Sequence, residues 1–108
     1  MTKKKAGLPQ HYTNIRSNYP RLAAALEGLG KAVREEGPID AKTAHLIQLA
    51  AAASIHSEGA VHSHAKRARE AGATPAEIRH ALVLCVSTVG FPTVAAALSW
   101  TEDVLRAQ

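Results

Sequence analysis

The stretch from Gly72 to Ile78, GATPAEI, has the clearest local signal in this sequence. Gly72 suits the left-handed conformation that ends a helix, and Thr74 suits the cap that starts the next one. Pro75 fits a first helical turn, where a missing N–H costs nothing, and Glu77 can close a capping box with the threonine. We therefore expect one helix to end before this stretch and another to begin within it.

Further helix signals lie on its N-terminal side, and no segment alternates with the period of two that is typical of a strand. One helix is expected from Pro20 to the Gly37-Pro38 pair. Another should start at an Asp40 cap and end at a break at Gly59, and a third should run from about 60 to 71. The predicted apolar faces are Leu22, Leu26, Leu29 and Val33 for the first helix, and Ala44, Ile47, Ala51 and Ile55 for the second.

On the C-terminal side the sequence predicts two more helices. The first follows Thr74, with a buried stripe that runs through Cys85 to Val89. The last starts at Gly90-Phe91-Pro92 and continues to about Arg106. The fold class is therefore all-α, a single domain of about five to six helices. Residues 1–17 are expected to be a flexible basic lead-in, and residues 18–108 the helical domain.

Composition predicts an oligomer. The chain has 108 residues, of which 46% are apolar, and much of that fraction is alanine. Alanine buries little area, so a monomer would have a thin core. We expect part of the apolar surface to be buried between subunits.

Charge and cysteine content limit the partners. The net charge is +4, but Lys3, Lys4 and Lys5 supply three of the positive charges at one terminus. The remainder is nearly neutral, so no nucleic-acid partner is expected. The apolar stretch Leu46–Ile55 is too short to span a bilayer, so no membrane partner is expected either. The single cysteine excludes an intrachain disulfide and fits a cytoplasmic location.

The order of these signals resembles the carboxymuconolactone decarboxylase and alkylhydroperoxidase D-like family. The resemblance rests on His64, then Gly72, then Thr74-Pro75-x-Glu77-Ile78, then Gly90-Phe91-Pro92 and an alanine-rich helix. It covers roughly residues 20–107. It implies the family's helical fold, a trimer or hexamer, and a site at the start of the central helix.

The sequence departs from the peroxidase branch of that family at the reactive positions. The resemblance expects a Cys-x-x-Cys pair at Ser57 and Ala60 and a glutamate at His45, and only the histidine at His64 is kept. A thiol peroxidase needs a thiolate and a resolving thiol, which serine and alanine do not supply. The decarboxylase branch does not require the cysteine pair, so the sequence favours that branch.

His64 and His45 are the candidate catalytic residues. An imidazole can act as general acid or base because its ordinary pKa lies near 6.5. The alternative for His64 is a half-buried helix histidine, and for His45 simple drift at a lost site. Four further residues are candidates for a substrate pocket: Ser57, Glu58, Ala60 and His56. Glu58 has the alternative role of favouring a helix start, and Lys66, Arg67 and Arg69 either form a solvated face or bind a substrate carboxylate.

A metal site is the weaker interpretation of the histidines. His45 and His56 are eleven residues apart and share a face only if their helix is continuous, in which case His64 would be a third ligand. His62 and His64 point in different directions on a helix, and no histidine pair has the usual i,i+4 spacing. We therefore expect no metal and no other cofactor.

Three functions remain open. The first is a decarboxylase-like lyase that acts on a small carboxylated or lactone-type metabolite by histidine acid–base chemistry. The second is an alkylhydroperoxidase-family relative that has lost its thiols and is not a peroxidase, or is a binding module. The third is a histidine-rich metal-binding oligomer.

Overall fold

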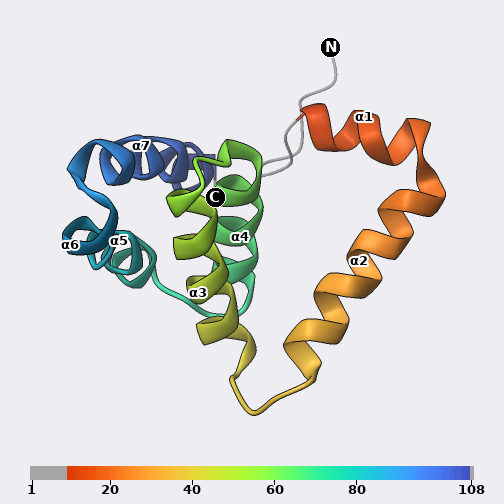
Figure 1. Ribbon diagram of the computed structural model, residues 1–108, viewed down its shortest axis with the longest axis horizontal. Helices are drawn as coiled ribbons and strands as arrows, with labels where there is room; N and C mark the ends of the chain where they lie inside the picture. The colour runs from red at the N-terminus through yellow and green to blue at the C-terminus, as the bar shows by residue number, and fades with distance from the viewer. Residues whose placement is uncertain (1–9, 108) are drawn as a thin grey trace.

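The computed structural model describes residues 10–107, and every element in that range is a helix (Figure 1). The all-α prediction is confirmed. The helices are α1 (Gln10–Asn18), α2 (Pro20–Glu35), α3 (Ala41–Ser54), α4 (Glu58–Glu70), α5 (Pro75–Val83), α6 (Val86–Val89) and α7 (Phe91–Ala107).

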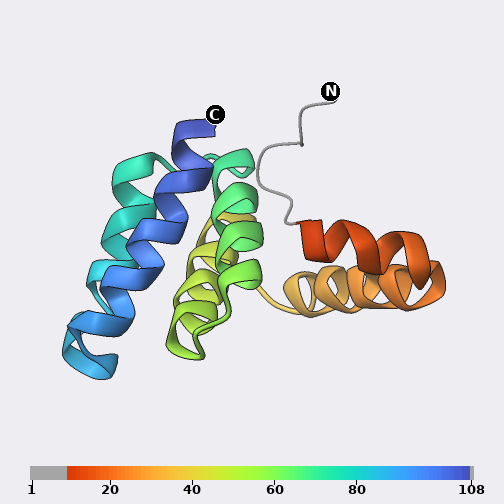
Figure 2. The same ribbon diagram turned by 90° about the horizontal axis from the view of Figure 1, so that it is seen from above.

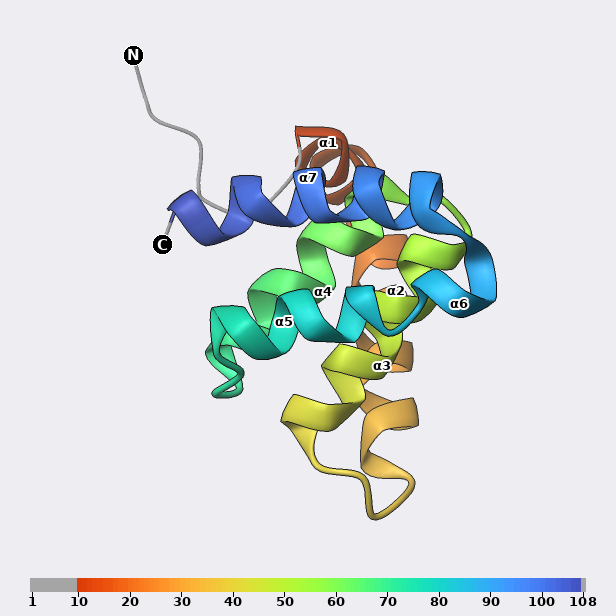
Figure 3. The ribbon, with the colours of Figure 1, turned by 90° about the vertical axis from the view of Figure 1, so that its left-hand side faces the viewer.

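Helices α3 to α7 form the bundle that holds the core. The α3–α4 hairpin is the most closely packed pair, and α7 packs against α4 and α5 (Figure 3). The largest fully buried side chains are Leu49, Ile78, Leu82, Val61, Val94, Val104 and Thr101. Seven of the thirteen buried apolar residues are alanines, so the helices approach closely around a thin core, as the composition predicts.

The connection between α4 and α5 matches the sequence prediction. Gly72 has φ 103°, and the Ala73 N–H donates to the Ala68 carbonyl at 2.9 Å, as in a Schellman motif. Thr74 Oγ1 accepts from the Glu77 N–H at 3.0 Å, and the Glu77 carboxylate accepts from the Thr74 N–H at 2.9 Å. This is the predicted capping box, and it sets the start of α5.

The predicted break at Gly59 is wrong. The chain turns at His56, which has φ 59°, and Ser57 caps α4 by accepting the Ala60 N–H at 3.4 Å. Gly59 therefore lies in the first turn of α4. A serine cap followed by an acidic residue determined the helix start more strongly than the glycine.

The predicted buried face of α3 is also wrong. Ile47 and Ile55 are 52% and 74% exposed, whereas the buried residues are His45, Leu49, Ala52 and Ala53. Helix α3 is apolar around most of its circumference, so the period of its apolar residues does not select one face.

The helix that starts after Thr74 is shorter than predicted. It ends at Val83, and the separate helix α6 follows after a tight turn in which the Cys85 N–H donates to the Leu82 carbonyl at 3.0 Å. Cys85 and Val89 nevertheless pack against the core. The predicted buried stripe is therefore confirmed in part: Ile78 and Leu82 are buried, whereas Cys85, Val86 and Val89 are only partly buried.

Helices α1 and α2 form an arm that extends from the bundle (Figures 1 and 2). They pack against each other, and a loop at Gly37-Pro38 connects α2 to α3. Residues 10–17, which belong to the expected flexible lead-in, are instead helical, and residues 1–9 lie outside the described range. None of the helices in the described chain is long and apolar enough to cross a bilayer.

The arm exposes the apolar stripe predicted for its longer helix. The stripe residues, Leu22, Leu26, Leu29 and Val33, are between 47% and 59% exposed. Ala23 is the only buried residue of α2 among those described. Within residues 10–107, nothing covers the stripe completely.

Candidate active site

His45 and His64 meet across the α3–α4 hairpin. The hairpin turns near His56, so a residue early in α3 lies opposite the middle of α4. The two Nδ1 atoms are 3.3 Å apart, and the ring centroids are 5.5 Å apart with a tilt of 38°. In such a contact one Nδ1 donates and the other accepts, so both rings cannot carry a proton there. The contact therefore excludes a doubly protonated pair.

Burial and nearby cations keep the pair neutral. Burial, then the neighbouring His45, Arg67 and Arg34, lower the pKa of His64 to about 4. The pKa of His45 is lowered by burial and then by Arg34 and Arg67, and Glu70 opposes that shift. Both imidazoles are therefore uncharged at neutral pH.

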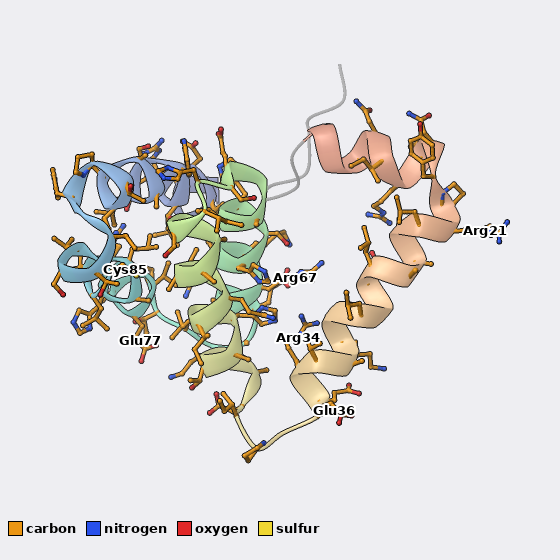
Figure 4. The ribbon with its side chains drawn as sticks, viewed as in Figure 1. Arg21, Arg34, Glu36, Arg67, Glu77 and Cys85 are labelled. Carbon is orange, nitrogen blue, oxygen red and sulfur yellow. The ribbon has the colours of Figure 1, made fainter. Side chains whose placement is uncertain are left out.

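Arg34 and Arg67 approach this pair from two helices. Arg34 lies on the side of α2 that faces α4, and Arg67 lies on the side of α4 that faces α2 (Figure 4). Both side chains are half-buried. Within the described residues neither guanidinium takes part in an ion pair. The site therefore contains two neutral imidazoles and two cations that no carboxylate of residues 10–107 pairs with.

Of the four predicted pocket residues, two have structural roles and two are exposed. Ser57 caps α4, and Ala60 packs against the apolar core. Glu58 is exposed in the first turn of α4, where a carboxylate stabilises the helix end. His56 is exposed at the turn. A role for these residues in binding substrate stays a prediction.

The three-histidine metal site is not assembled. Helix α3 ends at Ser54, so the continuous helix that would place His56 on the face of His45 does not exist. Within residues 10–107 no group of three histidine, cysteine or acidic side chains could hold a metal ion. His62 faces α7 instead, with its Nε2 3.7 Å from Asp103 Oδ2.

Arg34 is the site residue that sequence reasoning missed. It lies beside the apolar stripe of α2, where a charged residue is ordinary helix surface. The one local signal is Gly30, one turn earlier in the same helix. A Cβ added at Gly30 would lie 3.2 Å from a guanidinium nitrogen of Arg34, so the glycine leaves room for that group.

Gln48, three residues after His45, also has a buried Oε1 with no partner among the described residues.

Comparison with known proteins gives the family. The sequence model of the carboxymuconolactone decarboxylase family matches residues 20–103. The chain belongs to the carboxymuconolactone decarboxylase family. The match covers most of the chain and confirms the resemblance drawn from His64 and the motifs that follow it.

A solved family structure supports the fold. The chain is similar to the crystal structure of apo-lpg0406, a carboxymuconolactone decarboxylase family protein from Legionella pneumophila. The TM-score is 0.73 at 25% identity, over 90% of this chain and 87% of the other. An uncharacterized protein from Haemophilus influenzae is 36% identical over 57 residues, which are 53% of this chain and 50% of that protein. The chain thus matches about half the length of that relative.

Proposed function

We propose that this family member is a carboxy-lyase that acts on a small carboxylated, lactone-type metabolite, with His64 as the proton-transferring group and His45 in support. The observation that supports the proposal most is the 3.3 Å contact between the two Nδ1 atoms. Because Nδ1 of His64 is engaged with His45, Nε2 is the nitrogen left to exchange a proton with a substrate.

The low pKa of the free site suits a substrate that brings its own negative charge. With a pKa of about 4, His64 is neutral at pH 7 before substrate binds. A carboxylate bound nearby stabilises the imidazolium and raises that pKa. Substrate binding would therefore favour proton uptake by His64, against the burial that keeps its pKa low.

In the proposed step the bond between the carboxyl carbon and the substrate carbon breaks, and CO2 leaves. The electron pair of that bond stays with the substrate, and the His64 imidazolium delivers its proton to carbon. One proton is consumed for each carboxylate lost, so the step needs no oxidant or reductant. His45 contacts His64 and orients its ring.

The test is turnover of a panel of carboxylated γ-lactones, followed by CO2 release. Wild type should turn over at least one of them, and His64→Gln should lower kcat about 10²- to 10⁴-fold, the usual contribution of a general acid. His45→Gln should have a smaller effect because its role is indirect. His80→Gln, at an exposed position on α5, is the matched control. If wild type binds a lactone acid but turns over none of the panel, the chain is a binding module instead.

Thiol peroxidase chemistry has no support at this site. Cys85 is the only cysteine of the chain, and its Sγ–H donates to the Ala81 carbonyl at 3.5 Å at the edge of the core. We expect no thiol-dependent turnover of hydroperoxides. Saturable peroxidase activity that disappears in Cys85→Ser would contradict this expectation.

A metal-binding function is less well supported than acid–base chemistry. Zinc sites in proteins use three or four protein ligands, and among the described residues only two histidines meet here. The neighbouring Arg34 and Arg67 oppose a divalent cation by like-charge repulsion. Near-stoichiometric zinc that survives mild chelation and is lost in His45→Ala would favour the metal function.

We also propose that the protein is a cytoplasmic homo-oligomer, a trimer or hexamer, with no nucleic-acid or membrane partner. The support is the stripe of α2 and the exposed Ile47, Ile55 and Phe91 of the bundle, which are apolar surfaces of one chain. Symmetric association of identical subunits would bury such surfaces together. The single cysteine fits a reducing compartment.

A further inference from the structure

We propose that Arg34 of α2 and Arg67 of α4 form an oxyanion-binding site beside His45 and His64, which takes a carboxylate group of the substrate. The inference rests on the proposed function in taking the two histidines as the reacting groups. It adds two binding residues, one of which comes from the arm.

The placement of Arg34 is the first observation. Helix α2 is exposed along almost its whole length, yet Arg34 is half-buried. Figure 4 shows it on the side of α2 that faces α4, whereas Arg21 of the same helix projects outward. Gly30 leaves room for the guanidinium one turn earlier. Arg34 is thus half-buried on a helix whose other charged residues are exposed.

The charge balance is the second observation. Glu70, the acidic residue whose charge acts on His45, is in an ion pair with Lys66, and Glu35 is in one with Lys31. Arg34 and Arg67 have no such partner in the described chain. Both guanidiniums place positive charge at His64, and a bound anion would offset that charge. The site therefore selects for an anion and against a cation.

The geometry of the donors indicates the class of anion. A guanidinium presents a planar fork of N–H donors that matches the two oxygens of a carboxylate or of a phosphate. Two forks from different helices would hold such a group in a fixed orientation beside the imidazoles. The shared chemistry is an oxyanion, and a carboxylate is the form that the proposed reaction requires.

The histidines themselves report occupancy of this site. Arg34 and Arg67 both lower the pKa of His64, so an anion bound between them should raise it. Replacing either arginine should also raise the pKa of the free site, but it should weaken the response to an anion. Loss of a purely structural arginine would not both raise the pKa of His64 in the free protein and weaken its response to an anion.

The experiment is a histidine-ring NMR titration of the full chain with acetate, phosphate and chloride at constant ionic strength. Acetate should shift the His45 and His64 signals saturably and raise the pKa of His64, and chloride should do neither. Arg34→Gln and Arg67→Gln should each weaken acetate binding about tenfold or more, as expected for loss of a charge-assisted hydrogen bond. Arg21→Gln is the matched control and should bind like wild type.

Three outcomes would overturn the inference: no saturable response to acetate, equal affinity in Arg34→Gln and wild type, or a response to phosphate alone. In the last case the site is a phosphate site. Lactone turnover without arginine-dependent acetate binding would leave the proposed function standing and remove this inference. Arginine-dependent acetate binding without turnover of any lactone acid would support this inference and contradict the proposed function.

Discussion

At the scale of single residues, the contact between His45 and His64 determines how the protein responds to pH. The two neutral rings share one hydrogen bond, and Arg34 and Arg67 add repulsion to any extra proton. A protonated imidazole at this point would be both desolvated and surrounded by positive charge. Acidification should therefore destabilise the fold at this site first.

The first prediction concerns this pH dependence. The folded pKa of His64, about 4, lies below the unfolded value near 6.5, so the unfolded chain binds the proton more readily. The stabilisation is present above pH 6.5 and is lost as the pH falls toward 4. Allowing for partial exposure, we expect a loss of about 2 kcal/mol. Urea unfolding at pH 7 and pH 4.5 measures it, and His64→Gln should show a smaller loss. An equal loss in both proteins would contradict the prediction.

The second prediction concerns two turn residues with positive φ. His56 has φ 59° without being glycine, whereas Gly72 has φ 103° at the equivalent position after α4. Relief of the strained backbone should make His56→Gly more stable by about 0.5–1 kcal/mol, and Gly72→Ala should be destabilised by about 1 kcal/mol or more. Urea unfolding of the two variants checks both signs. A His56→Gly variant that is less stable than wild type would show that the imidazole makes a compensating contact.

At the scale of elements, predictability followed the strength of the local signals. The Thr74 capping box and Gly72 were found from sequence because their chemistry is complete within a few residues. The buried face of α3 was not predicted correctly, because alanines lie all around that helix. Only the packing of α3 against the other helices determines that His45 is buried. His45 and His64 were singled out as candidates by the family resemblance. Arg34 was missed because an approach between helices distant in sequence leaves no local pattern.

The third prediction compares the two glycines inside α2. A Cβ at Gly28 would meet nothing within 4 Å, whereas one at Gly30 would approach the Arg34 guanidinium. Alanine at either position should stabilise the helix by about 0.5–1 kcal/mol through its better helix propensity. Gly30→Ala should gain less and should also weaken acetate binding, because Arg34 must move. Thermal unfolding by circular dichroism and the acetate titration separate the two effects. Unchanged acetate affinity in Gly30→Ala would mean that the arginine relocates freely.

At the scale of the whole molecule, the arm makes the chain more extended than its length requires. The radius of gyration is 13.9 Å, against about 13 Å for a compact chain of this size. Figure 1 shows the reason, since α1 and α2 project beyond the bundle. The arm carries both the apolar stripe and Arg34, so assembly through the stripe and the proposed anion site involve the same helix, α2.

The last prediction tests that assembly. Leu26 and Leu29 lie in the middle of the stripe of α2, and burying a leucine side chain contributes about 1.5–3 kcal/mol. Light scattering of wild type should give several times the 11.4 kDa of one chain. Leu26→Glu should lower that mass, because a carboxylate in an apolar interface must be desolvated. Lys31→Glu places the same charge on the exposed side of α2 and should leave the mass unchanged. A wild-type monomer at micromolar concentration would contradict the proposal, and so would an equal loss of mass in both variants.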